Sequence, residues 1–445
     1  MKRIFLFTIV LLLGLLQSSN EDLAEPEINY KTSDFPADVA IEWINLERTL
    51  VKTTPGFSPP VAARSYGYAA LALYESVVAG IRENRSYLGL ISEYNNPGFK
   101  IENGKTYHWE LVANSCMADM MRNLFKTSSA SNKDLIDQLE QKYISKNISN
   151  DSVTINRSIQ FGKKVAEAIY SYAKSDGKEE AYANNFPDYT IPSGPDKWEP
   201  TSPTNLIPLQ AYWGSVRPFL APDADNSLIQ NFPPLSFSID SKSLFYLQAQ
   251  EVYIYSLNLD AEAIKIAKFW SDDPGITATP PGHSMSIAAI ILNNENANLA
   301  EAAEVFSKIG LAVHDAFISC WKSKYIYNLL RPVSYIKKYI DPNFTTLLST
   351  PPFPEHTSGH SVQTAAAMTV LESYYGSNYS FTDITHQDRS DIDGSPRNFT
   401  SFKACAAEAA ISRLYGGIHY RHAIDKGIEQ GTIIGNNIAR INLKK

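Results

Sequence analysis

A proline-rich segment divides this chain into two parts that both show helical periodicity. Ten of its 25 prolines lie between Pro187 and Pro234, and a regular helix cannot persist through prolines at that density. On both sides of the segment, apolar residues recur at intervals of three and four, whereas alternating strand patterns are rare. We therefore expect an all-α fold of two packed helical bundles, joined by a long irregular connection over residues 177–240.

Several predicted helices carry recognisable start signals. Pro59 and Pro60 can occupy the first turn of a helix, where proline is tolerated. Ser131 and Asp151 stand where helix caps belong. The pattern from Leu299 to about Tyr335 predicts one long helix. The expected helices cover residues 36–51, 59–78, 105–126, 131–146, 150–175, 242–257, 260–271, 283–293, 299–335, 358–375, 401–414 and 423–441.

The first residues have the pattern of a secretory signal peptide. Lys2 and Arg3 precede an apolar run from Ile4 to Leu16, which small polar residues follow. A membrane anchor is the alternative, but the run is shorter than the ~20 residues that a membrane span needs. We therefore expect a signal peptide at 1–19, a first bundle with its connection at 20–240, a second bundle at 241–445, and a secreted or periplasmic protein.

The overall charge argues against partners that are themselves polyanions. Removing Lys2 and Arg3 leaves 38 basic and 47 acidic residues, a net charge of −9. Such a chain is not built around nucleic acid or an anionic membrane, so an anion site must be a local cluster of cations. The three cysteines allow at most one disulfide, and Cys116 and Cys320 are expected to be buried in helices.

One segment near residue 330 predicts such a cluster. Lys324 and Arg331 are seven residues apart, close to two helical turns, so both should lie on one helix face with Trp321 and Asn328. Pro332 should end or kink this helix. The surrounding positions are apolar and aromatic, so two cations there would need a buried anion. Two solvated surface cations are the alternative.

Two later segments add groups that suit an oxyanion. The loop 351–357 leads into Ser358, Gly359 and His360 at a predicted helix start, where free N–H groups and the helix dipole favour an anion. Farther along, a glycine pair lies between Arg413 and His419 and can turn His419 toward the same place. The three segments together supply three cations, neutral donors and two histidines for ligation and proton transfer.

In this order, the three motifs resemble those of one superfamily. Lys-x6-Arg-Pro, Ser-Gly-His and Ser-Arg-x5-His, over residues 324–419, are similar to the motifs of vanadium-dependent haloperoxidases and type 2 phosphatidic-acid phosphatases. The strings at 59–75 and 269–283 resemble secreted bacterial haloperoxidases, closest in character to flavobacterial iodoperoxidases. The resemblance implies helical bundles of the haloperoxidase and acid phosphatase type.

The resemblance also implies a cofactor, substrates and residue roles. The cofactor would be vanadate, and the substrates hydrogen peroxide and a halide. The similar strings favour iodide, whereas the pair Trp321 and Phe353 resembles chloride-competent members. The implied roles are His419 as the vanadium ligand, His360 as acid and base with help from Lys324, and as vanadate-holding groups Lys324, Arg331, Ser358, Gly359 and Arg413.

One position departs from the family pattern. An aspartate often stands four residues after the ligating histidine, where this chain has Ala423. Asp425, or another group, would then have to orient the imidazole of His419. Among the other histidines, His283 is expected to anchor a loop. The expected structural histidines are His108, His314 and His386, and those near the site in sequence are His356 and His422.

Two other functions compete with the haloperoxidase interpretation. In a secreted acid phosphatase the same cations would bind phosphate, His419 would form a phosphohistidine and His360 would protonate the leaving group. A non-enzymatic secreted binding protein could use the aromatic residues of 177–240. The pair of histidines beside three cations argues against such a binder.

Overall fold

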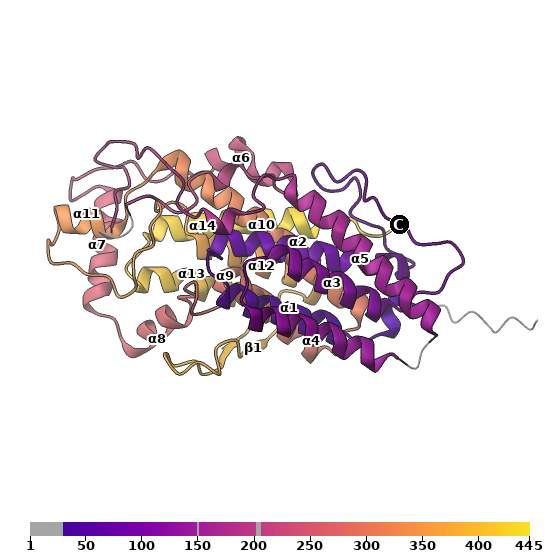
Figure 1. Ribbon diagram of the computed structural model, residues 1–445. Coiled ribbons are helices and arrows are strands. Elements are labelled where there is room, and N and C mark those ends of the chain that lie inside the picture. The colour runs from indigo at the N-terminus through magenta and orange to yellow at the C-terminus, as the bar shows by residue number, and fades with distance from the viewer. Residues whose placement is uncertain (1–29, 149–150, 202–205) are drawn as a thin grey trace, which may run out of the picture.

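The computed structural model describes residues 30–148, 151–201 and 206–445, so the predicted signal peptide lies outside the described residues. The described chain is mainly helical, as the sequence predicted, and it also contains one short hairpin (Figure 1). The α-helices are α1 Asp38–Thr53, α2 Pro59–Val77, α3 Trp109–Leu124, α4 Ala130–Lys146, α5 Ser152–Lys174, α6 Asn226–Gln230, α7 Leu244–Leu257, α8 Ala261–Phe269, α9 Thr279–Asn294, α10 Leu299–Tyr327, α11 Pro332–Tyr339, α12 Gly359–Tyr375, α13 Phe402–Tyr415 and α14 Arg421–Ala439.

The remaining elements are short. The hairpin pairs β1 (Phe381–Asp383) with β2 (Arg397–Phe399) in antiparallel register. The 3-10 helices are η1 Thr32–Asp34, η2 Val78–Gly80, η3 Ala181–Ala183, η4 Trp213–Ser215 and η5 Ala221–Ala224. Within the described ranges, no helix is long and apolar enough to cross a bilayer.

Helix α10 is the centre of the packing. Nearly all of its residues are buried, and it packs against α2 on one side and α12 on the other. The α2 contact is close: a Cβ on Gly310 would lie 2.8 Å from the backbone oxygen of Tyr66. Helix α14 approaches α12 in the same way, since a Cβ on Gly431 would lie 2.1 Å from the oxygen of Val362. Small residues therefore let these four helices share one hydrophobic core.

That core contains residues from both sides of the proline-rich connection, from Ala37 to Leu443. A second, smaller core gathers around α7 and α11, at the opposite end of the elongated molecule from α3, α4 and α5 (Figure 1). The connection itself is irregular, as predicted, with only short helices between residues 177 and 240. The assignment of 20–240 and 241–445 as separate bundles stays a prediction.

The predicted single helix over 299–335 is wrong. Helix α10 ends at Tyr327, and Asn328 takes a left-handed conformation with φ 50°. The next residues pair with the proline-rich connection: the Trp198 N–H donates to the Asn328 carbonyl at 2.7 Å. Pro332 then starts α11 instead of ending α10. A long-range backbone contact, together with the extended conformation favoured before proline, therefore overrides the helical periodicity.

Smaller differences concern helix ends and strands. Asp151 caps α5 as predicted, but the cap of α4 is Ser129 instead of Ser131. Helix α9 begins at Thr279, four residues earlier than expected, because two prolines occupy its first turn. The hairpin was not predicted, since strands of three residues are too short to show alternation.

Candidate active site

Lys324 is buried and binds the loop that carries the Ser-Gly-His motif. It lies in the last turn of α10, and its side chain is 0% exposed, so the surface alternative is wrong. Its Nζ donates to the carbonyls of Pro354, Glu355 and Thr357 at 3.1, 2.9 and 2.5 Å. An ammonium group has three protons, so these contacts account for all of them. Burial lowers the pKa of Lys324 to about 8.

Arg331 lies beside Lys324 in space, although not on the same helix. It precedes α11 and is fully buried. Its Nε donates to the Phe353 carbonyl at 2.8 Å, and its Nη1 donates to the Ile418 carbonyl at 2.9 Å. Its Nη2 has no partner among the described residues. Burial lowers the pKa of Arg331 to about 10. Arg331 thus joins the motif loop to the segment that carries His419.

His419 has one nitrogen bound to a carboxylate and the other beside a cation. Its Nδ1 lies 2.8 Å from Glu355 Oε1, which also accepts the Tyr420 N–H at 3.0 Å. Its Nε2 lies 3.1 Å from Arg331 Nη1, and a guanidinium can only donate. The ring proton therefore sits on Nδ1, and Nε2 keeps its lone pair. Burial, with Arg331 and Lys324, holds the pKa of His419 well below its usual range.

Glu355, instead of Asp425, orients the imidazole of His419. Asp425 is exposed, whereas Glu355 is fully buried between His419 and the backbone of Tyr420. Burial raises the pKa of Glu355 to about 7. Glu355 was missed because a carboxylate between proline and histidine in a loop has the pattern of a surface residue. Its position in the loop three residues before the Ser-Gly-His motif was the signal that could have found it.

Arg413 and His360 meet at one backbone carbonyl. Arg413 lies in the last turn of α13, and its Nη1 donates to the Trp270 carbonyl at 2.9 Å. His360, in the first turn of α12, also hydrogen-bonds to the backbone of Trp270. Arg413 Nε and His360 Nε2 are buried and have no partner in the described parts of the chain. Burial lowers the pKa of Arg413 to about 10 and that of His360 well below its usual value.

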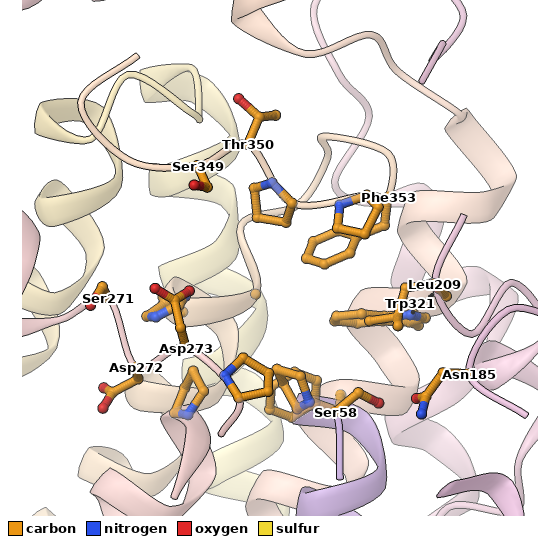
Figure 2. A pocket seen from close by; sticks show the side chains of 18 of the residues that line it. Ser58, Asn185, Leu209, Ser271, Asp272, Asp273, Trp321, Ser349, Thr350 and Phe353 are labelled. Atoms are coloured by element: carbon orange, nitrogen blue, oxygen red, sulfur yellow. Dashed lines mark hydrogen bonds between the residues drawn. The ribbon is translucent and has the colours of Figure 1, made fainter. Parts of the chain in front are cut away.

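A cavity of about 430 Å³ opens onto these groups. Its polar lining includes Gly359, His360, Arg413 and His419, and also the carboxylates of Asp272 and Asp273. Most of the rest is apolar, and Figure 2 shows Phe353 above Trp321 on one side of it. The two ring centroids are 4.9 Å apart. The fully buried Lys324, Arg331 and Ser358 are not on this lining. The structure therefore places Lys324, Arg331 and Ser358 behind the lining of a cavity that the other predicted site residues line: Trp321, Phe353, Gly359, His360, Arg413 and His419.

Comparison with known proteins identifies the family of this chain. A family model described as the second helical-bundle domain of VCPO matches residues 304–444. The crystal structure of a bacterial vanadium-dependent iodoperoxidase covers 94% of this chain and 100% of its own, with 32% identity and a TM-score of 0.83. This chain belongs to the vanadium-dependent haloperoxidases.

More distant haloperoxidases share the fold. Two structures of bacterial vanadium-dependent chloroperoxidase, one holo and one apo, are each 14% identical to this chain and cover 93% of it. Their TM-scores are 0.62 and 0.67, and the matches cover 92% and 98% of those chains. Vanadium chloroperoxidase of Curvularia inaequalis is 25% identical over 211 residues, which are 34% of this chain and only 35% of that protein.

The residues of this haloperoxidase fit a vanadate ion. Arg331 Nη2, Arg413 Nε and His360 Nε2 are buried polar atoms without a partner among the described residues. Ser358 is the N-cap of α12, so Gly359 and the free N–H groups of a helix start lie beside them. Lys324, Arg331 and Arg413 are buried and form no ion pair with a carboxylate among the described residues, because Glu355 pairs with His419. A tetrahedral oxyanion would supply the negative charge that these cations lack.

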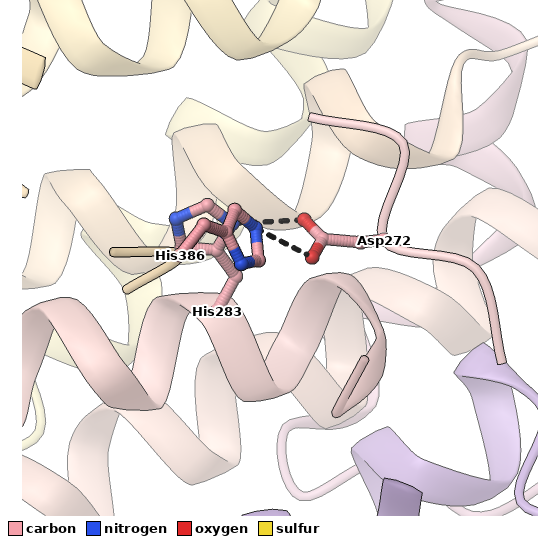
Figure 3. Close-up of side chains that lie close together, drawn as sticks. All are labelled: Asp272, His283 and His386. Atoms are coloured by element: carbon pink, nitrogen blue, oxygen red, sulfur yellow. Dashed lines mark hydrogen bonds and ion pairs between the residues drawn. The ribbon is translucent and has the colours of Figure 1, made fainter. Parts of the chain in front are cut away.

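A second group of buried ionisable residues lies next to the cavity. Figure 3 shows Asp272 facing the rings of His283 and His386. The Asp272 oxygens lie 2.8 Å from His283 Nδ1 and 3.2 Å from His386 Nε2, and Asp383 lies 2.7 Å from His283 Nε2. Two carboxylates would repel an oxyanion, so this group is distinct from the vanadate site. His283 does anchor a loop, as the sequence predicted.

The other two histidines near the site in sequence contact the proline-rich connection. The Nε2 atoms of His356 and His422 lie 2.8 and 2.9 Å from the carbonyls of Phe232 and Pro233. Neither histidine lines the cavity. They therefore fasten the connection to the second half of the chain.

Proposed function

We propose that this haloperoxidase oxidises iodide with hydrogen peroxide to hypoiodous acid, using a vanadate ion held at His419. The observation that carries the proposal is the state of His419: Glu355 binds its Nδ1, and Nε2 keeps its lone pair beside the guanidinium of Arg331. Bound vanadate would supply Lewis-acid activation of peroxide. The neighbouring residues then determine how the oxyanion is held and where protons move.

The three cations would hold the oxyanion in different ways. Arg331 and Arg413 have unused N–H groups, and the Ser358 hydroxyl and the Gly359 N–H can add neutral hydrogen bonds. Lys324 contributes mainly its charge, because its three protons are bound to carbonyls of the motif loop. Keeping that loop in place also keeps Glu355 against His419.

His360 is the proposed acid and base. Its pKa is held well below its usual value by burial and by Arg413, so the ring is neutral at ordinary pH. A neutral ring that hydrogen-bonds to the Trp270 backbone can exchange a proton at its unpartnered Nε2. His360 also lines the cavity, where peroxide would enter.

Iodide is the proposed halide for two reasons. The relative that is 32% identical over nearly the whole chain is described as an iodoperoxidase. The cavity beside Trp321 and Phe353 is largely apolar, which favours a large, weakly hydrated anion over small halides that lose more hydration energy. We further propose that residues 1–19 direct secretion, on the pattern of Lys2, Arg3 and the apolar run.

Halide competition tests this proposal. Vanadate-loaded protein would be assayed with iodide, bromide and chloride, and kcat/KM compared at one peroxide concentration. We expect iodide to exceed bromide by at least roughly tenfold, a free-energy difference of about 1.4 kcal/mol. Equal or faster bromide or chloride oxidation would overturn the iodide assignment. Hydrolysis of p-nitrophenyl phosphate without any halide oxidation would instead establish a phosphatase.

A further inference from the structure

The backbone of Trp270 joins two residues of the proposed vanadate site. Its carbonyl accepts from Arg413 Nη1 at 2.9 Å, and the backbone of Trp270 also hydrogen-bonds to His360. Trp270 is not on a helix: it follows α8 and begins an irregular segment toward α9. The orientation of Arg413 and His360 therefore depends on what holds this segment, which we call the 270–272 strap.

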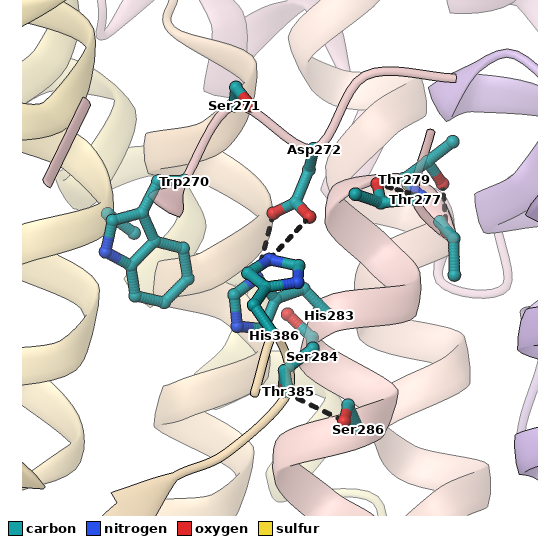
Figure 4. Close-up of polar contacts among 12 residues, drawn as sticks. Trp270, Ser271, Asp272, Thr277, Thr279, His283, Ser284, Ser286, Thr385 and His386 are labelled. Carbon is teal, nitrogen blue, oxygen red and sulfur yellow. Dashed lines mark hydrogen bonds and ion pairs between the residues drawn. The ribbon is translucent and has the colours of Figure 1, made fainter. Parts of the chain in front are cut away.

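His283 holds the 270–272 strap from two directions. Its ring stacks on the Trp270 ring, with centroids 4.4 Å apart and an interplanar angle of 17°. Its Nδ1 lies 2.8 Å from Asp272 Oδ2. Figure 4 shows Trp270 and Asp272 on either side of the His283 ring. His283 thus contacts both ends of the strap, while its own backbone is fixed in α9.

Asp383 fixes the far side of the His283 ring. Its Oδ2 lies 2.7 Å from His283 Nε2, and its Oδ1 accepts the Thr385 N–H at 2.9 Å. Asp383 ends β1, so the short hairpin connects to the strap through this carboxylate. Asp272, His283 and Asp383 are at most 2% exposed. This chain of contacts runs from the hairpin to the strap without solvent.

The charges in this chain of contacts favour a protonated ring. Burial alone would lower the pKa of His283, but the carboxylates of Asp272 and Asp383 outweigh it and raise the pKa to about 10. An imidazolium donates from both nitrogens, which matches a carboxylate on each side. A cation over the face of an indole ring is also favourable. Removing that charge would loosen the ion pairs and the Trp270 stack together.

We propose that the Asp272–His283–Asp383 triad is a positioning device for the vanadate site, which holds the strap so that the Trp270 carbonyl orients Arg413 and His360. The proposal rests on the proposed vanadate site. The three residues do not touch the oxyanion themselves. They act through Trp270, so their replacement should weaken oxyanion binding.

A metal ion at this place is the competing interpretation. Ligand atoms of Asp272, His283 and His386 lie within 4.8 Å of one another, as metal ligands would. However, each nitrogen of His283 already faces a carboxylate, and the imidazolium offsets part of their charge. Arg48, which lines the adjacent cavity of about 330 Å³, adds a further positive charge near both carboxylates. The negative charges of the two carboxylates are thus balanced without a metal ion.

Vanadate binding to the vanadate-free protein tests the proposal without depending on turnover. The variants are Asp383→Asn, which keeps the shape of the side chain, and His283→Gln. His314→Gln is the matched control, because His314 is equally buried in α10 and its ring contacts Arg217, Tyr68 and Phe219, which are not residues of the proposed vanadate site. Calorimetry would give the vanadate Kd, and a thermal melt would give Tm.

We expect both triad variants to raise the vanadate Kd by roughly 10–100-fold, the usual cost of losing a supporting contact behind a ligand. The control should lower Tm with a vanadate Kd within about threefold of the wild type. Triad variants that lower Tm but leave the Kd unchanged would overturn the proposal. A wild-type protein that binds no vanadate would overturn the proposed function and this inference with it.

A double-mutant cycle distinguishes positioning from general damage. If Asp383 acts through Arg413, Asp383→Asn should raise the Kd much less in an Arg413→Ala background than in the wild type. If Asp383→Asn raised the vanadate Kd by the same factor in both backgrounds, the two substitutions would act independently and the proposal would be contradicted. Elemental analysis of the purified protein tests the metal interpretation. A stoichiometric divalent metal that is lost in His283→Gln would overturn the positioning role of the triad and establish a metal site instead.

Discussion

Nδ1 of His419 lies 2.8 Å from Oε1 of Glu355, and this buried contact determines which imidazole nitrogen can bind a metal. The carboxylate accepts the Nδ1 proton and leaves the lone pair on Nε2. The contact also depends on Lys324, which holds the carbonyl of Glu355 at 2.9 Å. Glu355, whose backbone is held by Lys324, thus sets the tautomer of His419, the proposed vanadium ligand.

Replacing Glu355 should weaken the cofactor site without removing any atom that touches the oxyanion. Glu355→Gln keeps the size of the side chain but removes its charge, so we expect the vanadate Kd to rise by roughly 10–100-fold. Asp425→Asn is the control and should leave the Kd unchanged, because Asp425 is exposed. Equilibrium dialysis of vanadate measures both. Equal losses in the two variants would show that Glu355 has no specific role.

Arg331 should bind the oxyanion through a nitrogen that the protein does not use. Arg331→Lys keeps a positive charge but loses Nη2, the atom without a partner among the described residues. Hydrogen bonds to charged groups contribute about 1.5–3 kcal/mol, so the vanadate Kd should rise by roughly 10–100-fold. Calorimetry with vanadate-free protein measures the change. Arg122→Lys, in a partly exposed ion-pair group, should have no effect on the Kd.

Lys324 should matter for stability as well as for binding. Lys324→Met leaves three buried carbonyls without their donor, and each unsatisfied group costs roughly 1–3 kcal/mol. We expect a lower free energy of unfolding in urea and a loss of vanadate binding. Lys322→Met, on the same helix, removes a donor from only one carbonyl, that of Ala224. If Lys322→Met destabilised the protein as much, the three-carbonyl contact would not explain the effect.

Much of the site could be predicted from the sequence because its motifs are local. Ser358 and Gly359 are at the start of a helix, which the proline-rich loop before them predicted. Arg413 is near the end of a helix, before two glycines. The burial of Lys324 and Arg331 was also predicted, from their apolar neighbours. Their relative geometry was not, because the left-handed turn at Asn328 results from pairing with residues 196–198, which periodicity does not report.

The supporting residues could not be predicted for a similar reason. Glu355 becomes a partner of His419 only when the turn after Arg413 folds onto the motif loop. Trp270 orients Arg413 through a carbonyl, a group that every residue has and that no motif marks. Asp383 belongs to a three-residue strand that is far from His283 in the sequence. Side-chain identity alone does not predict such long-range contacts.

A buried carboxyl in the first half of the chain should make stability depend on pH. Glu47 is 0% exposed, and burial raises its pKa from 4.5 to about 8. The folded state therefore binds a proton that the unfolded state releases between these values. The stabilisation is complete below pH 4.5 and is lost as the pH rises through about 8, with a slope of at most about 1.4 kcal/mol per pH unit for this group.

Glu47→Gln should flatten this part of the stability profile, because an amide does not titrate. Urea unfolding at several pH values between 4.5 and 8 measures the slope. Glu42→Gln is the control, since the Glu42 side chain is 37% exposed and pairs with Lys142 at the surface. If the free energy of unfolding depended on pH with the same slope in Glu47→Gln and in the wild type, Glu47 would not be the group responsible.

The central claim is that vanadate bound at His419 is required for halide oxidation. Triiodide absorbance would be followed with purified protein, iodide and hydrogen peroxide, first after removal of bound oxyanions and then after addition of orthovanadate. We expect activity that appears only with vanadate and is lost in His419→Ala. Iodide oxidation that needs no vanadate, or that survives in His419→Ala, would contradict this claim.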